Sequence, residues 1–249
     1  MKKNIYIIGG SGLIGFELVK QLIKENNNLI VIDKINKFKK IQNLNFINLD
    51  ISNVKLIEKK FKKIFKVYGS PDSMINCSYP KTTKWKNNDF KRIDYKNYSQ
   101  NISIHLNSYI WITKIFSQEM TKKKTKKSSI VLLSSIYGFL GQNLNLYKNE
   151  KMRENITYAV IKGGIINAVR SFASYFGKKG LRINCISPGG VIDFDNQSKT
   201  FIKKYSDSVP LNRMANKNEI AKVIKFLISE ESSYITGQNI IVDGGYSII

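Results

Sequence analysis

Residues 4–15 read NIYIIGGSGLIG, and this stretch decides the fold class of the chain. Its apolar first part, up to Ile8, predicts a short buried strand, and the apolar spacing that starts near Gly12 predicts a helix. Gly9, Gly12 and Gly15 occupy the turn and the start of that helix. Glycines let a phosphate approach the backbone, and the N–H groups of a helix N-terminus point towards it. The stretch therefore predicts a pyrophosphate-binding turn, with a tight turn that binds nothing as the alternative.

The same alternation of strand and helix continues along the chain. We expect strands at residues 4–8, 29–32, 46–49, 73–76, 130–133, 182–186 and 239–242. We expect helices at residues 12–25, 54–67, 98–120, 156–176 and 217–229. Short apolar strands between longer helices predict an α/β fold, a doubly wound Rossmann-type parallel sheet of about seven strands with helices on both faces. No repeat or Pro/Gly/Ser-rich linker interrupts the pattern, so residues 1–249 are expected to form one domain.

The composition excludes several classes of protein. With 42% hydrophobic residues and four prolines among 249 residues, the chain can bury a large core and is not disordered. Its two cysteines, Cys77 and Cys185, exclude a disulfide framework and a four-cysteine zinc site, and a single histidine argues against a histidine-based metal cage. We therefore expect no bound metal. No apolar run reaches the ~18 residues of a membrane span, and the run in residues 1–8 is too short for a signal peptide. We expect a soluble cytoplasmic protein without a membrane partner.

The formal charge of the chain is +23 at pH 7. Only five of its 41 cationic residues are Arg and the rest are Lys, although Arg is the usual residue for bidentate contacts with bases and phosphates. This bias favours a solvated lysine surface and no nucleic-acid partner; a functional surface for a polyanion is the alternative. The densest run, residues 122–127, is expected in a loop between a helix and a strand.

Two carboxylates follow the predicted second and third strands. Asp33 closes the second strand, roughly 20 residues after the glycine turn. A carboxylate there accepts hydrogen bonds from the adenosine ribose and repels a 2′-phosphate, which favours NAD(H) over NADP(H), although Lys34 and Lys37 lie close by. Asp50 closes the third strand, where it can contact the adenine amino group or instead cap a helix near Ser52.

Tyr158 and Lys162 lie four residues apart in the predicted helix 156–176, so they share a face of it. An ammonium group beside a phenol favours the phenolate and brings proton exchange closer to neutral pH. The pair therefore predicts a proton-transferring tyrosine, with an exposed helical pair as the alternative. The adjacent Gly163 and Gly164 weaken a helix, which indicates close packing against a ligand or another element.

With five further motifs, these residues resemble the short-chain dehydrogenase/reductase family in its compact single-domain form. The resemblance covers nearly the whole chain. The further motifs are Asn76-Cys77-Ser78-Tyr79, Ser134-Ser135-Ile136-Tyr137-Gly138, Ser187-Pro188-Gly189-Gly190, Pro210-Leu211-Asn212-Arg213-Met214, and Ile235-Thr236-Gly237-Gln238 followed by Val242-Asp243-Gly244-Gly245. Their occurrence in this order implies an enzyme that interconverts an alcohol and a carbonyl by hydride transfer with a nicotinamide dinucleotide.

The resemblance also implies roles for individual residues. Ser135 hydrogen-bonds the substrate oxygen, Tyr158 is the general acid or base, and Lys162 binds the nicotinamide ribose and lowers the pKa of Tyr158. The residues expected around the cofactor are Gly9, Ser11, Gly12, Leu13, Ile14, Gly15, Asp33, Asp50, Ile51, Asn76, Cys77, Tyr158, Lys162, Pro188, Gly189 and Val191.

A homodimer or homotetramer is a further implication of the resemblance. In such assemblies helix 156–176 is expected at a subunit interface. Its apolar residues fit that interface, and they fit ordinary core packing equally well. These residues are Ile165, Ile166, Val169, Phe172 and Phe176.

The chain departs from the family pattern at the glycine turn and at one catalytic position. Two residues separate Gly9 from Gly12, where compact members usually have three. The helix asparagine that normally completes the catalytic set is also absent at its expected place. Matching the apolar phase of residues 105–110 puts His105 there, with Asn107 as the competing choice. An imidazole in place of the amide would change the pH dependence of the reaction.

A third departure is the length of chain between Ser135 and Tyr158, which is greater than the family usually has. The additional segment, residues 139–157, includes Tyr147, Lys148, Lys151 and Arg153. It is either a surface insertion, which loops tolerate, or a substrate-recognition loop for a phosphate or carboxylate.

The insert and the motifs at 76–80 and 135–138 also resemble dehydrogenases of bacterial surface-polysaccharide or flagellin-glycan synthesis, which implies a small sugar-derived substrate. Two other functions stay open. A 3-oxoacyl-carrier-protein reductase would explain the C-terminal motifs, although Asp33 argues against the NADP(H) that such reductases use. A non-catalytic regulator that senses the dinucleotide would not need Ser135, Tyr158 and Lys162 together.

Overall fold

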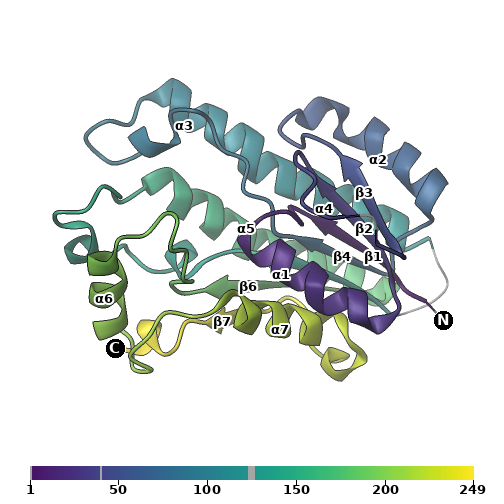
Figure 1. Ribbon diagram of the computed structural model, residues 1–249. Helices are drawn as coiled ribbons and strands as arrows, with labels where there is room; N and C mark the ends of the chain where they lie inside the picture. Colours follow the sequence, from purple (N-terminus) through teal and green to yellow (C-terminus); the bar gives the residue numbers. More distant parts are fainter. Residues whose placement is uncertain (1, 40, 123–126) are drawn as a thin grey trace.

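The computed structural model describes residues 2–39, 41–122 and 127–249 (Figure 1). Seven parallel strands form one sheet in the order β3-β2-β1-β4-β5-β6-β7. The strands are β1 (Asn4–Ile8), β2 (Asn28–Asp33), β3 (Leu44–Asn48), β4 (Ser73–Asn76), β5 (Ser128–Leu133), β6 (Leu181–Pro188) and β7 (Asn239–Val242). All seven predicted strands are confirmed. Most of the lysine run at 122–127 lies outside the described residues, so its loop stays a prediction.

Helices pack on both faces of the sheet (Figure 1). One face is covered by α1 (Leu13–Leu22) and α7 (Lys217–Ile228). The opposite face is covered by α2 (Val54–Tyr68), α4 (Asn107–Met120) and α5 (Ile156–Phe176). The short α3 (Tyr95–Asn101) leads into α4, and α6 (Lys199–Asp207) follows β6. The doubly wound fold expected from the sequence is confirmed.

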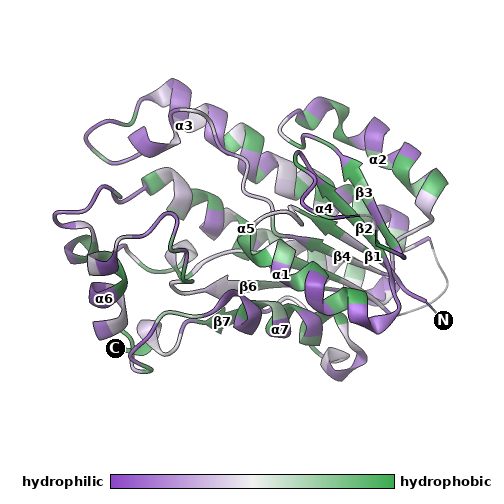
Figure 2. Ribbon diagram, viewed as in Figure 1, coloured by the Kyte–Doolittle hydropathy of each residue, from purple (hydrophilic) through white to green (hydrophobic). Residues whose placement is uncertain are grey.

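Strand β1 is apolar from Ile5 to Ile8 because both of its faces are buried. Ile5 and Ile7 belong to the core beneath α1 and α7, whereas Tyr6 and Ile8 belong to the core beneath α2, α4 and α5. Successive side chains of a strand point to opposite faces, so a strand that is covered on both sides needs apolar residues at every position. In Figure 2, β1 to β3 are hydrophobic along most of their length, and α2 alternates between hydrophobic and hydrophilic turns.

Two helical segments differ from the sequence prediction. The helix expected at 98–120 is interrupted, because Ile102–Leu106 forms a π-helical turn between α3 and α4. Such turns are rare and occur frequently at functional sites. The second difference is α6, which the sequence pattern did not predict. Its buried residues Phe201 and Tyr205 are four positions apart, and one such pair is too little periodicity to indicate a helix.

Helix α5 begins and ends where the sequence predicts, but its apolar residues do not form a free surface. Ile165, Ile166, Val169 and Phe176 are buried in the core, and Phe172 packs against that core from a half-buried position. The place of α5 at a subunit interface stays a prediction, and core packing of these side chains is confirmed. The reason is that α5 lies directly against the sheet, which covers its apolar face within the same chain.

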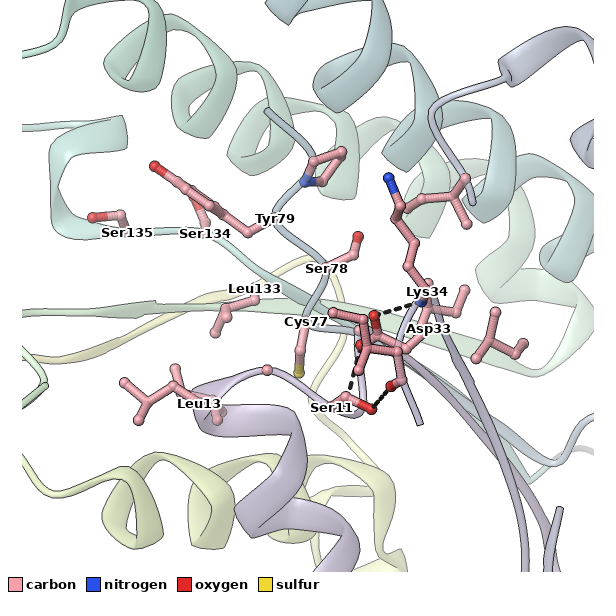
Figure 3. Close-up of a pocket in the computed structure, with 18 of the residues that line it drawn as sticks. Ser11, Leu13, Asp33, Lys34, Cys77, Ser78, Tyr79, Leu133, Ser134 and Ser135 are labelled. Carbon is pink, nitrogen blue, oxygen red and sulfur yellow. Dashed lines mark hydrogen bonds between the residues drawn. The ribbon is translucent and has the colours of Figure 1, made fainter. Parts of the chain in front are cut away.

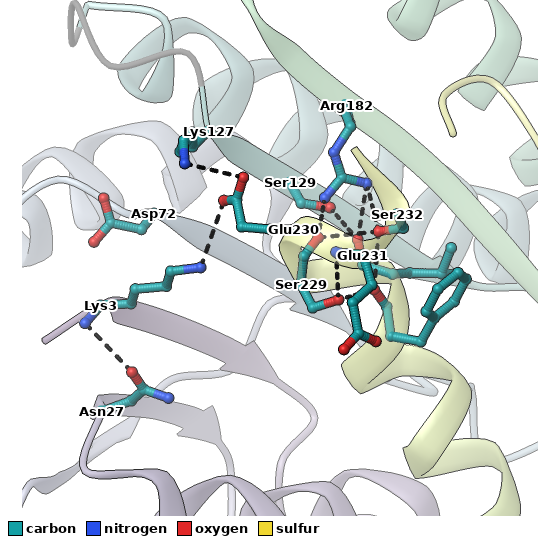
Figure 4. A network of polar contacts seen from close by, with 12 residues as sticks. Lys3, Asn27, Asp72, Lys127, Ser129, Arg182, Ser229, Glu230, Glu231 and Ser232 are labelled. Atoms are coloured by element: carbon teal, nitrogen blue, oxygen red, sulfur yellow. Dashed lines mark hydrogen bonds and ion pairs between the residues drawn. The ribbon is translucent and has the colours of Figure 1, made fainter. Parts of the chain in front are cut away.

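At the amino-terminal edge of the sheet, the Arg182 side chain holds the end of α7 (Figure 4). Its guanidinium donates hydrogen bonds to the carbonyl oxygens of Leu227 and Ser229 at 3.0 and 2.9 Å and to Ser232 Oγ at 2.9 Å. The last carbonyl groups of a helix lack partners within the helix, so a half-buried arginine that reaches them stabilises the helix end. Arg182 thereby joins β6 to α7.

The opposite edge, at the carboxyl ends of the strands, is where the candidate site lies. β1 has β2 on one side and β4 on the other, so the strand order reverses at β1. In open parallel sheets, ligands bind at the carboxyl ends of the strands at this point of reversal. The glycine turn that follows β1 is therefore well placed. None of the helices in residues 2–39, 41–122 and 127–249 combines the length and the apolar character that crossing a bilayer requires.

Candidate active site

The glycine turn packs so tightly against neighbouring backbone that a side chain would not fit at Gly9 or at Gly15. Gly9 has a positive φ of 77°, and a Cβ there would lie 2.5 Å from the Ser78 Cα. A Cβ on Gly15 would collide with the carbonyl oxygen of Gly9. Helix α1 starts directly after Gly12, whose N-cap position has no side-chain hydrogen bond to the first N–H groups. Those N–H groups are available to an anion, so the turn fits a dinucleotide pyrophosphate.

A cavity of about 560 Å³ extends from this turn along the carboxyl ends of the strands (Figure 3). Most of the residues that the sequence predicts around the cofactor line it. These are Gly9, Ser11, Gly12, Leu13, Ile14, Asp33, Asp50, Ile51, Cys77, Tyr158, Lys162, Pro188, Gly189 and Val191. Ser135 lines the same cavity, whereas Gly15, Asn76 and His105 do not. The residues come from the ends of separate strands, so the sheet itself assembles the cavity.

Asp33 ends β2 beside the glycine turn, and its carboxylate accepts two backbone hydrogen bonds (Figure 3). Its Oδ2 accepts from the Ser11 N–H at 2.9 Å, and its Oδ1 accepts from the Lys34 N–H at 2.7 Å. A carboxylate offers about four acceptor positions, so two remain for a ligand. The Lys34 ammonium forms an ion pair of 3.0 Å with Asp50. Asp50 Oδ1 also accepts from the Ser52 N–H at 2.9 Å, so Asp50 stabilises the turn before α2 rather than capping that helix.

Ser135, Tyr158 and Lys162 meet at the inner end of the cavity. Ser135 follows β5 and caps a short helical turn, while Tyr158 lies in the first turn of α5. The Asn155 side chain caps α5 by accepting from the Tyr158 N–H at 2.9 Å. Lys162 is buried one turn later, where its ammonium donates to the Leu133 carbonyl oxygen at 2.8 Å and lies 5.5 Å from the centre of the Tyr158 ring.

Two contacts hold the end of β5 against the middle of α5. The Ser134 hydroxyl donates to the Lys162 carbonyl oxygen at 2.9 Å. Gly138 lies so close to α5 that a Cβ there would be 2.7 Å from the Lys162 carbonyl carbon. The close packing expected around Gly163 is confirmed, since a Cβ on that residue would lie 3.0 Å from the Gly138 carbonyl oxygen. These contacts fix the position of Ser135 relative to Tyr158.

Burial sets the protonation of the pair Tyr158 and Lys162. It raises the pKa of Tyr158 to about 12, against the opposing effect of a hydrogen bond from Ser135. It lowers the pKa of Lys162 to about 7. In the protein without cofactor, burial therefore outweighs any lowering of the Tyr158 pKa by Lys162, and the expected role of Lys162 stays a prediction. The Tyr158 phenol therefore stays protonated in the neutral range, and Lys162 loses its charge as the pH rises through about 7.

His105 and Asn107 were the two choices for the fourth catalytic position, and the structure separates them. Asn107 is exposed at the start of α4, whereas His105 is fully buried in the π-helical turn. The His105 ring lies edge-on to Tyr79 at 5.2 Å, and neither of its nitrogens has a hydrogen-bond partner among the described residues. Burial and the nearby Lys162 hold its pKa well below the usual range, so the imidazole is neutral.

Asn76 lies behind the cavity wall rather than in it. Its Oδ1 accepts hydrogen bonds from the Ser78 N–H at 3.1 Å and from the Ser78 hydroxyl at 2.6 Å. Residues 77–80 form the wall in front of it. In this structure Asn76 therefore supports the segment that forms the wall, and its expected role in bracing the cofactor stays a prediction. Sequence spacing could not separate these two roles.

A second cavity of about 690 Å³ adjoins the first at Ser135 and Tyr158. The insert 139–157 forms part of its wall and is folded onto the body of the protein. Its buried residues Leu146 and Tyr147 share a small core with Phe201 and Tyr205 of α6. The insert is therefore placed as a substrate-recognition loop would be, beside the catalytic residues, and is not a detached surface loop.

Sequence reasoning missed several side chains of this second cavity. Tyr79, Trp85 and Tyr137 line it, and the Tyr79 and Trp85 rings lie edge-on to Tyr158 at 5.9 and 6.4 Å. Tyr79 and Tyr137 belong to the motifs at 76–79 and 134–138, two or three residues after a predicted site residue. This proximity could have indicated that they line the site. Trp85 had none, because it lies in a short 3-10 turn between β4 and α3 that no quoted motif includes.

The fold, the glycine turn and the buried serine, tyrosine and lysine together define a dinucleotide-dependent oxidoreductase. The family model adh_short_C2, described as "Enoyl-(Acyl carrier protein) reductase", matches residues 11–247. The chain belongs to the short-chain dehydrogenase/reductase family. It is accordingly an oxidoreductase that acts on CH–OH groups with a nicotinamide dinucleotide.

Three similar proteins illustrate the range of the family. The chain is 30% identical over 260 residues to "Post-translational flagellin modification protein A" of Campylobacter coli, covering 99% of this chain and 98% of that one. It is 30% identical to a 3-oxoacyl-(acyl-carrier-protein) reductase of Buchnera aphidicola subsp. Schizaphis graminum, covering 98% and 97%. A short chain dehydrogenase from Leptospira borgpetersenii, solved with bound NAD+, superposes with a TM-score of 0.88 at 30% identity, covering 99% and 93%.

Proposed function

We propose that this chain is an NAD(H)-dependent enzyme that interconverts an alcohol and a carbonyl on a sugar-derived substrate of surface-glycan synthesis. The observation that carries the proposal is the position of Ser135 and Tyr158, which line both cavities. A substrate in the second cavity would present its oxygen to these two side chains, while the first cavity would hold the cofactor. We further propose that residues 1–249 act as one cofactor-binding domain.

The roles of the side chains follow from this arrangement. When bound, the nicotinamide dinucleotide supplies or accepts the hydride. In carbonyl reduction, Tyr158 gives its phenolic proton to the substrate oxygen as negative charge develops there, and the Ser135 hydroxyl donates a hydrogen bond to the same oxygen. Lys162 is positioned by the Leu133 carbonyl to contact the ribose of the cofactor and to stabilise the phenolate that remains.

His105 lies behind these three residues and is proposed as the fourth member of the catalytic set. Its two ring nitrogens and the Asn76 Nδ2 are buried without partners among the described residues. Buried polar atoms of this kind are usually satisfied by ordered water. A water between His105 and Lys162 would connect the lysine to further proton donors. This role differs from that of the usual asparagine amide, because a neutral imidazole can accept as well as donate a proton.

The preference for NAD(H) over NADP(H) is supported by the charges around the adenosine end of the first cavity. Asp33 presents a carboxylate, and the nearest lysine, Lys34, is neutralised in its ion pair with Asp50. Among the described residues that line this end of the cavity, Lys37 is the further lysine that could attract a 2′-phosphate. The structure of the Leptospira borgpetersenii relative holds NAD+. Parallel fluorescence titrations with NADH and NADPH test the proposal, and tighter binding of NADPH would contradict it.

Replacement of Asp33 by Ala is expected to reduce the preference for NADH over NADPH by about tenfold or more, because the variant loses both the acceptor for the ribose hydroxyls and the charge that repels a phosphate. The dissociation constants of both cofactors are measured by fluorescence for the wild type and the variant. Glu17→Ala on α1, which removes a carboxylate that lines neither cavity, is the matched control. An unchanged ratio in Asp33→Ala would show that Asp33 does not determine the preference.

The pKa of Tyr158 predicts opposite pH profiles for the two directions. Reduction needs the phenol and oxidation needs the phenolate, and burial raises the pKa to about 12. The phenol is therefore protonated throughout the neutral range. We expect the rate of reduction to stay nearly constant between about pH 6 and about pH 9, and the rate of oxidation to rise steeply with pH over the same range. Steady-state rates in both directions test this, and an oxidation rate that falls as pH rises would contradict it.

The sugar-derived substrate is supported by the flagellin-modification relative and by the lining of the second cavity. Aromatic, amide and charged side chains surround it, among them Trp85, Gln142 and Asp193. Such a lining suits a polyhydroxylated ligand. The acyl-carrier-protein reductase of Buchnera aphidicola favours the second candidate, a 3-oxoacyl thioester. Parallel assays with sugar and sugar-nucleotide alcohols plus NAD+, and with a 3-oxoacyl thioester plus NADH or NADPH, decide between the two.

Two further points belong to the proposal. We expect a homodimer or homotetramer, which the outward faces of α4 and α5 support because Trp111 and Tyr175 are exposed there. Size-exclusion chromatography with light scattering measures the assembly. A cytoplasmic location is supported by the need for a nicotinamide dinucleotide and by the two cysteines, which are both free thiols.

A further inference from the structure

The second cavity contains an arginine without an ionic partner. Three of the five arginines of the chain have recorded partners in the structure: Arg92 pairs with Asp89, Arg213 with Glu219, and Arg182 holds the end of α7. Arg153 lines the second cavity and has no carboxylate within 4.0 Å among the described residues. Only five of the 41 cationic residues of the chain are Arg. An arginine in this cavity therefore suits an anionic ligand, because its planar guanidinium matches phosphate and carboxylate groups.

Three lysines line the same cavity, and none of them is neutralised. Lys81, Lys86 and Lys151 have no carboxylate within 4.0 Å in the part of the chain that the structure describes. The cations come from two segments, 81–86 and 151–153. Two of the three carboxylates of the lining, Asp193 and Asp195, come from a third segment, and the remaining one is Glu154. The cavity therefore keeps uncompensated positive charge on the side formed by the first two segments.

Hydrogen bonds hold those two segments together beside the catalytic residues. The Asn155 Nδ2 donates to the Trp85 carbonyl oxygen at 3.4 Å, and the Thr157 hydroxyl donates to Asn88 Oδ1 at 2.6 Å. The Ile156 N–H donates to the Asn88 carbonyl oxygen at 3.2 Å. Arg153 is thus attached to the same framework as Trp85, and that framework continues directly into Tyr158.

A buried hydroxyl in the same cavity also lacks a partner. Tyr137 lines the cavity two residues after Ser135, and its hydroxyl lies next to Tyr147 without completing a hydrogen bond to any described residue. A buried polar atom without a partner costs about 1–3 kcal/mol in general, so its position indicates a hydrogen bond that a ligand or water completes. Together with the aromatic wall of Tyr79 and Trp85, this hydroxyl suits a sugar ring with several hydroxyl groups.

From these observations we infer that the substrate is a sugar that carries an anionic group, a phosphate or a carboxylate, bound by Arg153 with the support of Lys86 and Lys151. Trp85 and Tyr79 contact the sugar ring, and the Tyr137 hydroxyl binds one of its hydroxyls. The inference rests on the proposed oxidoreductase function, because the second cavity is taken as the substrate site. It narrows the substrate class and assigns the insert its task, which is to hold the charge of the substrate.

The test uses the protein saturated with NAD+, so that the pyrophosphate site is filled before any other anion is added. Thermal unfolding is followed with glucose, glucose 6-phosphate or glucuronate at constant ionic strength. A ligand that binds only the folded protein raises the unfolding temperature. We expect a rise with at least one of the two anionic sugars and little or none with glucose. A rise with glucose 6-phosphate alone assigns the site to a phosphate, and a rise with glucuronate alone assigns it to a carboxylate.

Arg153→Gln is expected to weaken binding of the anionic sugar at least tenfold while leaving the dissociation constant of NADH unchanged. Lys59→Gln on the outer side of α2 removes one charge far from both cavities and is the matched control. Tyr137→Phe should weaken binding of the same sugar without removing charge. Equal stabilisation by glucose, stabilisation by none of the three compounds, or equal loss in Arg153→Gln and Lys59→Gln would overturn the inference. If NAD+ itself does not bind, the proposed function fails instead.

Discussion

Replacing Tyr158 by Phe is expected to lower kcat at least ~10³-fold, because the variant lacks the proton that reduction delivers to the substrate oxygen. The ring itself remains, so its contacts with Tyr79 and Trp85 are kept. We therefore expect the dissociation constant of NADH to change by less than about twofold. The measurement is turnover followed by NADH absorbance, in parallel with a fluorescence titration of NADH.

The comparison of the two measurements makes this test specific for chemistry. A variant that loses both turnover and NADH binding would indicate a misfolded site rather than a missing proton donor. Ser135→Ala serves as the graded partner, since it removes a hydrogen bond to the substrate oxygen and leaves the proton donor in place. Unchanged turnover in Tyr158→Phe would remove Tyr158 from the mechanism.

Lys162→Met is expected to abolish turnover and, at the same time, to raise the free energy of unfolding at pH 7 by about 3–4 kcal/mol. Lys162 is buried, and its pKa falls from 10.5 to about 7 in the folded protein. At pH 7 an unfolded chain holds this proton firmly, so folding has to release it or bury the charge, at a cost of about 1.4 kcal/mol for each pH unit between the two pKa values. Loss of the hydrogen bond to the Leu133 carbonyl offsets about 1 kcal/mol of the gain.

The stability difference between Lys162→Met and the wild type is expected to depend on pH. A lysine whose pKa is lowered on folding binds fewer protons in the folded state, so its unfavourable effect is full below pH 7 and vanishes as pH rises to about 10.5. The stability gain of Lys162→Met over the wild type should therefore decrease between about pH 7 and about pH 10.5. Urea unfolding of both proteins without cofactor, at several pH values, measures it. A variant that is less stable than the wild type at pH 7 would contradict the expected burial cost.

The parts of the fold that could be predicted are those that local sequence pattern determines. All seven strands follow from short apolar runs, and α5 follows from apolar spacing that is continuous from Ile156 to Phe176. The glycine turn could be placed from its offset after a strand, and Tyr158 and Lys162 from their shared helix face, whereas Ser135 was assigned only through the family resemblance. Their convergence at one edge of the sheet is a consequence of parallel topology.

The parts that could not be predicted depend on tertiary surroundings. Periodicity placed Ile165 and Val169 on one face of α5 but could not say whether the sheet or another subunit covers that face. The π-helical turn around His105 adds a residue to a helical pattern without any glycine or proline to mark it. The pKa of Tyr158 was expected to be lowered by a nearby charge, whereas the depth of burial, which no spacing reveals, raises it.

The two cavities are built from different parts of the fold. In the proposed function, the sheet edge, with the glycine turn, Asp33 and the end of β5, would hold the cofactor. The substrate side is built mainly from three connecting segments, at residues 79–86, 137–155 and 190–205, that contribute no strand to the sheet. These segments can exchange residues, or length, without disturbing the strand register beneath them. If the second cavity is the substrate site, a lineage of such enzymes can acquire new substrates by rebuilding this outer wall, while the residues at the sheet edge are inherited unaltered.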